Sequence, residues 1–199
     1  MGRSTPWLPS GDIMLPIVLD VGALRIVLVG EGEAGLKRLE LLDAAGAANV
    51  EVYSGALEGA LARRAGTRLK GTRPSSEALE AAGLVLIAGL DEAGSEALAA
   101  AARKAGRLVN TEDRKPLCDF HIPSTVRRGD LLLTVSTGGQ SPGLARRLRR
   151  YLEGLFGPEW SGRLKELAER REVWRAEGLD LSEVGRRSEA YIEEEGWLP

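Results

Sequence analysis

The sequence predicts an α/β protein: a Rossmann-type parallel sheet with helices on both faces, followed by a small α+β segment and a helical C-terminal region. Short β-branched runs alternate with Ala- and Leu-rich stretches from Arg25 onward, which is the pattern of parallel strands joined by helices. A glycine-rich turn follows the first of these strands. After about residue 112 the alternation stops, which predicts a second unit of different architecture.

Composition is typical of a soluble globular protein with a sizeable core. The chain has 199 residues, of which 43% are hydrophobic and 28% are charged, values close to those of ordinary domains. The formal net charge of −2 gives no general attraction to nucleic acid or to anionic lipid. We therefore expect neither a nucleic-acid partner nor a membrane partner.

The few metal-binding and redox-active side chains narrow the chemistry further. One cysteine, Cys118, cannot form an internal disulfide, and one histidine, His121, cannot build a His-rich metal site. Both residues are predicted to be core residues in the first place. The sequence thus predicts a protein of the reducing cytoplasm without a metal site of its own.

The first residues of the chain are expected to stand apart from the fold. Residues 1–13 contain Pro6, Pro9 and Gly11 and are predicted to be a flexible extension, with Met14 an alternative start that stays open. The apolar run from Met14 to Leu19 is too short for a membrane span and lacks the layout of a signal peptide.

The elements of the first region follow from the alternation. Gly106 is expected to end the last helix there as a C-terminal cap. The predicted strands cover residues 25–29, 50–53, 68–70, 84–88 and 108–110, and the predicted helices cover residues 34–45, 57–64, 76–82 and 92–105.

A dinucleotide-binding fingerprint lies between the first strand and the first helix. Residues 30–35 read Gly-Glu-Gly-Glu-Ala-Gly, which is G-x-G-x-x-G. Gly30 would permit the tight turn, Gly32 would let the backbone approach a pyrophosphate, and Gly35 would allow close packing of the helix, whose N-terminus favours an anion. The alternative is a glycine-rich turn that only packs.

The end of the second strand departs from the fingerprint. An acidic residue is expected there, about 20 residues after the glycines, to bind the adenosine ribose. This chain has Tyr53-Ser54-Gly55 instead. The choice between NAD and NADP therefore stays open at this point.

The second region begins with a loop containing Pro116. It continues with a basic turn at Arg127-Arg128-Gly129 and a strand over 131–136. A helix should start at Ser141-Pro142, a combination that favours a helix N-terminus. Further helices are predicted over 160–174 and after Gly178.

Several motifs of both regions resemble the precorrin-2 dehydrogenase/sirohydrochlorin ferrochelatase family. Together with Leu15-Pro16-Ile17 and the glycine turn, the likeness covers nearly everything from Met14 to about Leu155. The segments that carry it are Asn110-Thr111-Glu112-Asp113, Leu117-Cys118-Asp119-Phe120, Ile122-Pro123 and the run from Val135 to Arg146, which reads Val-Ser-Thr-Gly-Gly-Gln-Ser-Pro-Gly-Leu-Ala-Arg.

This resemblance implies an activity and an assembly. The activity is NAD-dependent oxidation of precorrin-2 to sirohydrochlorin in siroheme biosynthesis, with insertion of ferrous iron by some members. The assembly is a homodimer whose contacts come from the segment after the Rossmann domain. The domains implied are a Rossmann domain over 14–112, a dimerisation segment over 113–145 and a helical domain over 146–199. The methyltransferase domain of some siroheme synthases is expected to be absent, because the chain is too short for it.

The resemblance also implies roles for individual residues. Asp113 matches the catalytic aspartate and would act as general base, although a loop Asp taken by itself is more often a turn or capping residue. The positions expected to bind NAD are Gly30, Glu31, Gly32, Glu33, Ala34, Gly35, Ser54, Gly89, Leu90, Asp91 and Asn110. The chain departs from the family at Gly35, at the end of the second strand and at Gly89-Leu90-Asp91.

The substrate-binding positions follow from the carboxylates of precorrin-2. The loop of residues 136–139, with two glycines and free backbone amides, precedes an arginine-rich helix. Together they would bind acetate and propionate groups. The alternative is that Leu144, Ala145, Leu148 and Leu152 form a packed face and the arginines are only solvated. The candidates are Asp119, which could equally cap a turn, and Ser136, Thr137, Gly138, Gly139, Ser141 and Arg146.

Three functions remain open from the sequence. The first is a dehydrogenase that is also a chelatase, and the second is a dehydrogenase whose product receives its metal from another protein. The third is a non-catalytic nucleotide-sensing module, which would leave Asp113 and the loop of residues 136–139 without a role. Whether iron or cobalt is inserted also stays open.

Overall fold

The computed structural model describes residues 14–198 and divides into two compact units, separated between Ile122 and Pro123. The predicted extension over 1–13 lies outside the described residues. The boundary falls ten residues after the predicted one, because the segment after residue 112 packs on the Rossmann unit. Asp119 N–H donates to Val109 O at 2.7 Å, and Phe120 packs on the core. Residues 123–198 lie in one unit, so the structure does not separate the expected segments at residue 145.

The first unit is the predicted Rossmann-type fold, and this prediction is confirmed. Five parallel strands lie in the order β3-β2-β1-β4-β5. The order reverses direction between β1 and β4, which makes their carboxyl ends the topological switch point. The strands are β1 (Arg25–Gly30), β2 (Asn49–Tyr53), β3 (Leu69–Gly71), β4 (Leu84–Ala88) and β5 (Leu108–Thr111).

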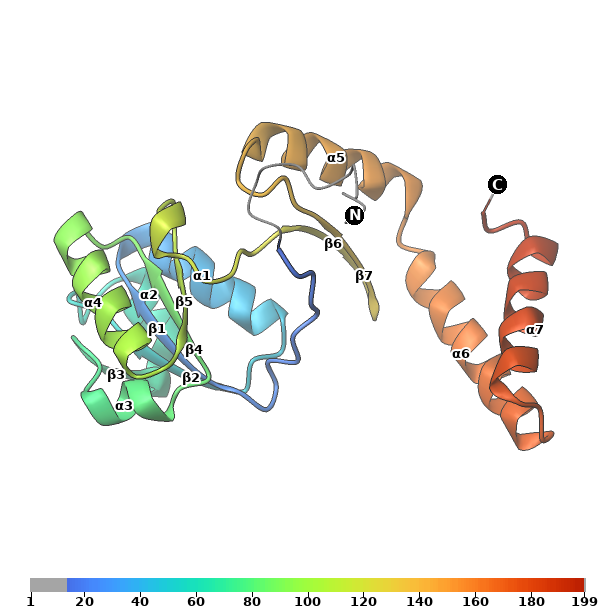
Figure 1. Cartoon of the computed structure of the whole chain (residues 1–199), viewed down its shortest axis with the longest axis horizontal. Coiled ribbons are helices and arrows are strands. Elements are labelled where there is room, and N and C mark those ends of the chain that lie inside the picture. The colour runs from blue at the N-terminus through green and yellow to red at the C-terminus, as the bar shows by residue number, and fades with distance from the viewer. Residues whose placement is uncertain (1–13, 199) are drawn as a thin grey trace, which may run out of the picture. The chain divides into compact units, whose positions relative to one another are not determined.

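Continuous apolar runs place β1 and β4 in the centre of the sheet. Because side chains alternate between the two faces of a strand, Ile26 and Leu28 enter one core cluster while Val27 and Val29 enter the other. Figure 1 shows α1 and α4 on opposite sides of the sheet. The four helices of this unit are α1 (Gly32–Ala44) and α2 (Ala60–Ala65) on the first cluster, and α3 (Ser76–Ala81) and α4 (Glu92–Lys104) on the second.

Two elements differ from the sequence prediction. The helix predicted from residue 57 begins only at Ala60, after Gly59 with a φ of 111°. The basic segment predicted as a turn is strand β6 (Ser124–Arg128), and the turn follows at Gly129, whose φ is 58°. The run Ser-Thr-Val before the arginines is typical of a strand and could have indicated β6.

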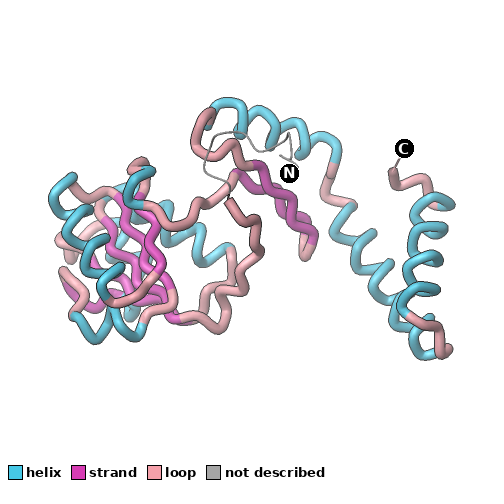
Figure 2. The backbone as a smooth tube through the Cα atoms, viewed as in Figure 1, coloured by secondary structure: helices cyan, strands magenta, loops and turns pink. Residues whose placement is uncertain are grey.

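The second unit is a β-hairpin followed by helices (Figure 2). Strand β6 pairs antiparallel with β7 (Leu131–Val135), and α5 (Pro142–Leu155) packs on both strands. Ser141 caps α5 as predicted, accepting from the Leu144 N–H at 3.2 Å. The chain ends with α6 (Trp160–Ala176) and α7 (Leu181–Glu194).

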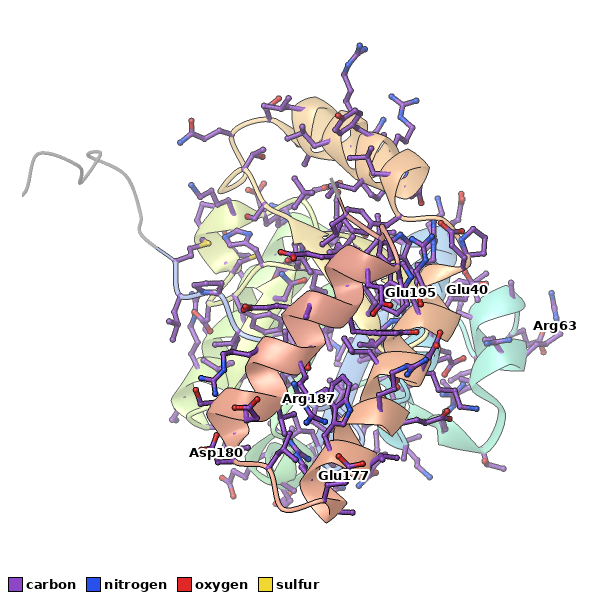
Figure 3. The ribbon with its side chains drawn as sticks, turned by 90° about the vertical axis from the view of Figure 1, so that its right-hand side faces the viewer. Glu40, Arg63, Glu177, Asp180, Arg187 and Glu195 are labelled. Carbon is purple, nitrogen blue, oxygen red and sulfur yellow. The ribbon has the colours of Figure 1, made fainter. Side chains whose placement is uncertain are left out.

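The helices α6 and α7 form an antiparallel pair. Figure 3 labels Arg187 of α7 and Glu177 at the end of α6, which form an ion pair at 3.3 Å. Asp180 caps α7 by accepting from the Glu183 N–H at 2.8 Å. None of the helices within residues 14–198 is both long enough and apolar enough to cross a membrane.

A pair of salt bridges joins α1 to the segment that contains α2. Asp43 binds Arg64 at 2.7 Å and Arg68 at 2.5 Å. The hydrogen bond from Arg68 is the largest cause that lowers the pKa of the Asp43 carboxyl below its usual value. Because the folded pKa lies below the unfolded one, this stabilisation is present above about pH 4 and is lost as the pH falls through the folded pKa.

We therefore expect Asp43→Asn to lower the free energy of unfolding by roughly 1 kcal/mol at neutral pH, since both arginines are partly exposed. The difference from the wild type should shrink below about pH 4. Urea denaturation at pH 7 and pH 3 measures both values, and Glu40→Gln on the same helix is the control. An equal loss at both pH values would contradict this account.

Candidate functional site

The candidate cofactor site is the edge of the sheet where β1 and β4 end. The glycine turn of residues 30–35 follows β1 at this edge, where open α/β sheets bind their ligands. The segments after β2, β4 and β5 begin at the same edge because all five strands are parallel. The structure thereby brings together the predicted cofactor-binding positions and Asp113, all within the first unit.

Gly30 and Gly35 bring α1 directly against β1. A Cβ atom at Gly35 would lie 2.8 Å from the carbonyl carbon of Gly30 and 2.9 Å from Cδ2 of Leu61. A Cβ atom at Gly30 would lie 2.8 Å from Cα of Gly35. Distances this short exclude any side chain at either position, so both glycines are required for α1 to begin where it does.

Gly32 leaves the start of α1 open. Its φ is 54°, and a Cβ atom there would meet nothing within 4 Å. The N-cap residue Glu31 makes no side-chain hydrogen bond to the first turn of α1. The first-turn amides therefore remain available as donors, and together with the helix dipole they fit a pyrophosphate.

Gly89 closes the other side of the turn. Its φ is 74°, and a Cβ atom there would lie 2.4 Å from the carbonyl oxygen of Glu31. The Glu31 N–H donates to Ala88 O at 2.9 Å, so the loops after β1 and β4 lie against each other. Leu90 packs on the second core cluster, and Asp91 caps α4 by accepting from Gly94 N–H at 2.8 Å.

Asn110 presents an unused acceptor at the carboxyl end of β5. Its side chain is buried, and Nδ2 donates to Phe120 O at 2.9 Å. Its Oδ1 is buried without a hydrogen-bond partner among the described residues. Because an unsatisfied buried acceptor is costly, this atom fits a donor group of a bound dinucleotide.

Asp113 occupies a strained turn just beyond β5. Its φ is 55°, and no other non-glycine residue in the described part of the chain has a positive φ. The turn is fixed on both sides: Glu112 N–H donates to Ile87 O at 2.9 Å, and Cys118 Sγ donates to Thr111 O at 3.0 Å. Such strain is typical of functional positions, and it leaves the Asp113 side chain exposed.

Arg38 is a site residue that the sequence reasoning missed. It lies on α1 with a side chain only 13% exposed, and it forms an ion pair with Glu112 at 4.0 Å. Burial lowers the pKa of this guanidinium, and the charges of Glu112, Cys118 and Asp113 oppose that shift. Its place one helical turn after Gly35 could have indicated that it faces the ends of the strands.

Asp119 has a structural role in the fold. Its Oδ2 accepts from Val109 N–H at 2.9 Å, and its Oδ1 accepts from Arg103 Nε at 3.0 Å. These bonds attach the loop after β5 to the strand and to α4. These hydrogen bonds support the alternative that Asp119 fixes a turn. No contact of this kind supports its expected role in binding substrate.

The predicted substrate loop lies in the second unit and is largely bonded to itself. Gly138 N–H donates to Ser136 Oγ at 3.3 Å, Gln140 N–H to Thr137 O at 3.0 Å, and Ser141 N–H to Thr137 Oγ1 at 3.2 Å. The expectation of free amides is wrong for these three residues, because the turn uses them to satisfy its own backbone. Gly139, with a φ of 77°, belongs to the same turn.

The arginine-rich helix also differs from its expected packing. Ala145 is buried and Leu152 is partly buried, but Leu144 and Leu148 are 50% and 40% exposed. The packed face is therefore narrower than the one offered as the alternative to substrate binding. Arg146 is exposed to solvent.

The comparisons with known proteins agree with this geometry. The family model described as "Putative NAD(P)-binding" matches residues 17–124, which is more than half of the chain. The chain belongs to this NAD(P)-binding family. A second model, described as "Sirohaem biosynthesis protein central", matches residues 128–155. The resemblance predicted from the motifs is confirmed at this level, and so is the prediction of a dinucleotide cofactor.

Similar curated proteins are siroheme synthases. One from Methylococcus capsulatus is 40% identical over 157 residues, which are 77% of this chain and 33% of that protein. One from Thiobacillus denitrificans is 38% identical over 78% of this chain and 33% of that protein. Siroheme synthase 1 of Yersinia enterocolitica is 33% identical over 91% of this chain and 42% of that protein. The NAD(P)-binding chain thus spans about a third to two fifths of these relatives.

A solved structure has the same fold. The protein named "SirC, precorrin-2 dehydrogenase" superposes with a TM-score of 0.71 at 21% sequence identity, covering 93% of this chain and 92% of that one. At this identity the likeness concerns the fold. It extends beyond the NAD(P)-binding unit to the helical C-terminal region.

Proposed function

We propose that this chain oxidises precorrin-2 to sirohydrochlorin with NAD as the hydride acceptor, in siroheme biosynthesis. The observation that carries the proposal is Asp113, an exposed carboxylate in a strained turn at the same sheet edge as the glycine turn. The tandem matches to an NAD(P)-binding family and to a siroheme-biosynthesis segment support it. A nucleotide-sensing module would need no such carboxylate.

The residues of the first unit account for the parts of this reaction. The nicotinamide, when bound, supplies the hydride acceptor. The substrate loses one hydride and one proton, and Asp113 accepts the proton as general base. The first-turn amides of α1 bind the pyrophosphate, and Asn110 Oδ1 accepts a hydrogen bond from the cofactor. Arg38 is a positioning residue that places a positive charge near the Glu112-Asp113 turn.

The same carboxylate could serve a second reaction. Insertion of ferrous iron removes protons from pyrrole nitrogens, and Asp113 is a base for this step as well. Within residues 14–198 no three His, Cys, Asp or Glu side chains are grouped to bind a metal ion. In the proposal, iron is a substrate, and chelation is tested separately from oxidation.

For the substrate, we propose that exposed groups of the second unit bind its carboxylates. Arg146 supports this role because its guanidinium is free to approach an acetate or propionate group. Ser136, Thr137, Gly138, Gly139 and Ser141 shape the turn that precedes this helix. The reaction is assigned to the cytoplasm, in keeping with the single thiol of Cys118.

We further propose that the protein is a homodimer formed through the second unit. A two-stranded hairpin is at best marginally stable by itself, and within β6 and β7 only Val126 is buried. One side of α5 presents an exposed apolar stripe at helical spacing. It consists of Leu144, Leu148, Tyr151 and Leu155, which are 50%, 40%, 64% and 54% exposed. A second copy of this chain would bury the exposed part of the hairpin and the apolar stripe of α5.

Leu148→Glu is expected to convert the dimer into monomers, because it places a charge in the centre of the apolar stripe. Light scattering after size-exclusion chromatography measures the mass. Arg150→Glu is the control: Arg150 lies on the opposite side of α5 from the stripe, and this variant should remain dimeric. A dimeric Leu148→Glu protein, or a monomeric wild type, would rule out this interface.

An anaerobic assay tests the proposed activity. Purified protein is incubated with precorrin-2 and either NAD or NADP, and sirohydrochlorin formation is followed by absorbance. Ferrous iron is added only after the first reaction stops. Sirohydrochlorin formed only with a dinucleotide supports the dehydrogenase, and iron insertion faster than without protein adds the chelatase. No oxidation with either dinucleotide would refute the proposal in favour of the sensing module.

A further inference from the structure

We propose that Glu31, from the glycine turn itself, supplies the ribose-binding carboxylate that β2 lacks, and that it selects NAD over NADP. The inference rests on the proposed use of a dinucleotide and concerns its adenosine half. It assigns a specificity-determining role to a residue between the two first glycines of the motif.

The end of β2 offers no acid of its own. Tyr53, Ser54 and Gly55 occupy the positions where a Rossmann domain usually has its ribose-binding acid. Glu51 lies on β2 but is engaged elsewhere: it pairs with Arg25 at 2.5 Å and accepts from the Tyr53 hydroxyl at 3.0 Å. A carboxylate at this place must come from another segment.

Glu31 brings its carboxylate to this place. Its backbone is extended, with φ −127° and ψ 148°, and its side chain does not cap α1. Instead Oε1 accepts from the Gly55 N–H at 2.5 Å, and Oε2 accepts from Ser54 Oγ at 3.3 Å. The side chain therefore crosses from the end of β1 to the end of β2, where two donors fix it.

Gly55 provides an independent sign that this place is built around the carboxylate. A Cβ atom at Gly55 would lie 2.9 Å from Glu31 Oε1. Any larger residue would have to displace the carboxylate. The absence of a side chain at position 55 and the presence of an acid at position 31 thus fit each other sterically.

A cavity large enough for an adenosine lies beside Glu31. Its volume is about 320 Å³, and its lining joins the first turn of α1 to the loop after β2. This volume is at the lower end of ordinary ligand sites. Nine described residues line it, two of them acidic and none of them basic: Gly32, Glu33, Leu36, Ser54, Ala56, Glu58, Gly59, Ala60 and Leu61.

The charges around this cavity favour hydroxyl groups over a phosphate. An ionised carboxylate accepts hydrogen bonds from the 2′- and 3′-hydroxyls of the NAD ribose. The 2′-phosphate of NADP would be repelled by Glu31 and Glu58, whereas the charge of Glu33 is balanced by its ion pair with Lys37 at 2.6 Å. A neighbouring hollow includes Arg63, but Figure 3 shows Arg63 projecting away from α2. NAD is therefore the expected cofactor.

Calorimetric titration of the full chain with NAD and with NADP tests the inference without any turnover. The wild type should bind NAD at least roughly tenfold more tightly than NADP. Glu31→Gln keeps an acceptor for Gly55 N–H but removes the charge, and it should weaken NAD binding by roughly tenfold while NADP binding stays equal or improves. Glu31→Ala, a second variant, should narrow the selectivity further.

Glu40→Gln is the matched control, because Glu40 is an exposed residue of α1 (Figure 3) and the same charge is removed. Its NAD and NADP affinities should equal those of the wild type. A wild type that binds both dinucleotides equally, or binds neither, overturns the inference. So does tighter NAD binding by the Glu31 variants, which would mean that Glu31 occupies the ribose position. If selectivity depends on Glu31 but precorrin-2 is not oxidised, the proposed function fails alone.

Discussion

Asp113→Asn is expected to lower kcat for precorrin-2 oxidation by about 100-fold or more, the usual contribution of a general base. Asparagine has nearly the same shape and tolerates the left-handed backbone at φ 55°, but its amide cannot accept the proton. Asp113→Ala should abolish oxidation as well. The NAD dissociation constant should not change, because Asp113 lies outside the glycine turn. Anaerobic activity assays measure kcat, and calorimetric titration measures the NAD dissociation constant.

Asp119→Asn separates chemistry from structure at the same loop. Its carboxylate binds Val109 N–H and Arg103, so this variant should lose thermal stability and keep much of its turnover. The opposite pattern, with full activity in Asp113→Asn and none in Asp119→Asn, would move the general base to Asp119. Normal turnover in both variants would remove this loop from the mechanism.

Gly32→Asp is expected to raise the NAD dissociation constant by roughly 10- to 100-fold. The substitution places a carboxylate at the open start of α1, where it competes with the pyrophosphate for the amides and repels it. Space is not the cause, because a Cβ atom at Gly32 meets nothing within 4 Å. Calorimetric titration with NAD gives the constant directly.

Gly46→Asp is the control for backbone strain. Gly46 also has a left-handed backbone, with a φ of 78°, and its Cβ position is equally open. It follows the other end of α1, so the same strain and the same charge are introduced away from the glycine turn. If both variants bind NAD alike, the pyrophosphate does not lie at Gly32.

The sequence by itself determined the sheet and the position of the glycine turn. Parallel central strands are buried on both faces, so residues 26–29 of β1 and Leu84–Ala88 appear as uninterrupted apolar runs. The glycines are determined by local geometry as well, since Gly30 and Gly35 touch within one strand-turn-helix segment. The cap at Ser141 is another local feature. Signals of this kind lie within a few residues of each other and can be read directly.

Only the tertiary structure decided how distant segments complete the site. The sequence showed no acid after Tyr53, yet Glu31 reaches Ser54 and Gly55 from 23 and 24 residues away. Arg38 faces the Glu112-Asp113 turn across the sheet edge. Sequence spacing does not encode such contacts, because they depend on the order in which the strands pair.

The second unit shows the same division. The Ser141-Pro142 start predicted α5, and helical spacing predicted α6. The packed face that the sequence offered for α5, made of Leu144, Ala145, Leu148 and Leu152, is covered only in part. Leu148 is 40% exposed and Ala145 is buried, although both are apolar residues of one helix. An apolar side chain favours burial wherever it lies. The packing of the hairpin against α5 decides which of these side chains are buried within a single copy of the chain. The sequence thus determined the elements and the chemistry of their ends, and the tertiary structure determined which of those ends share a site.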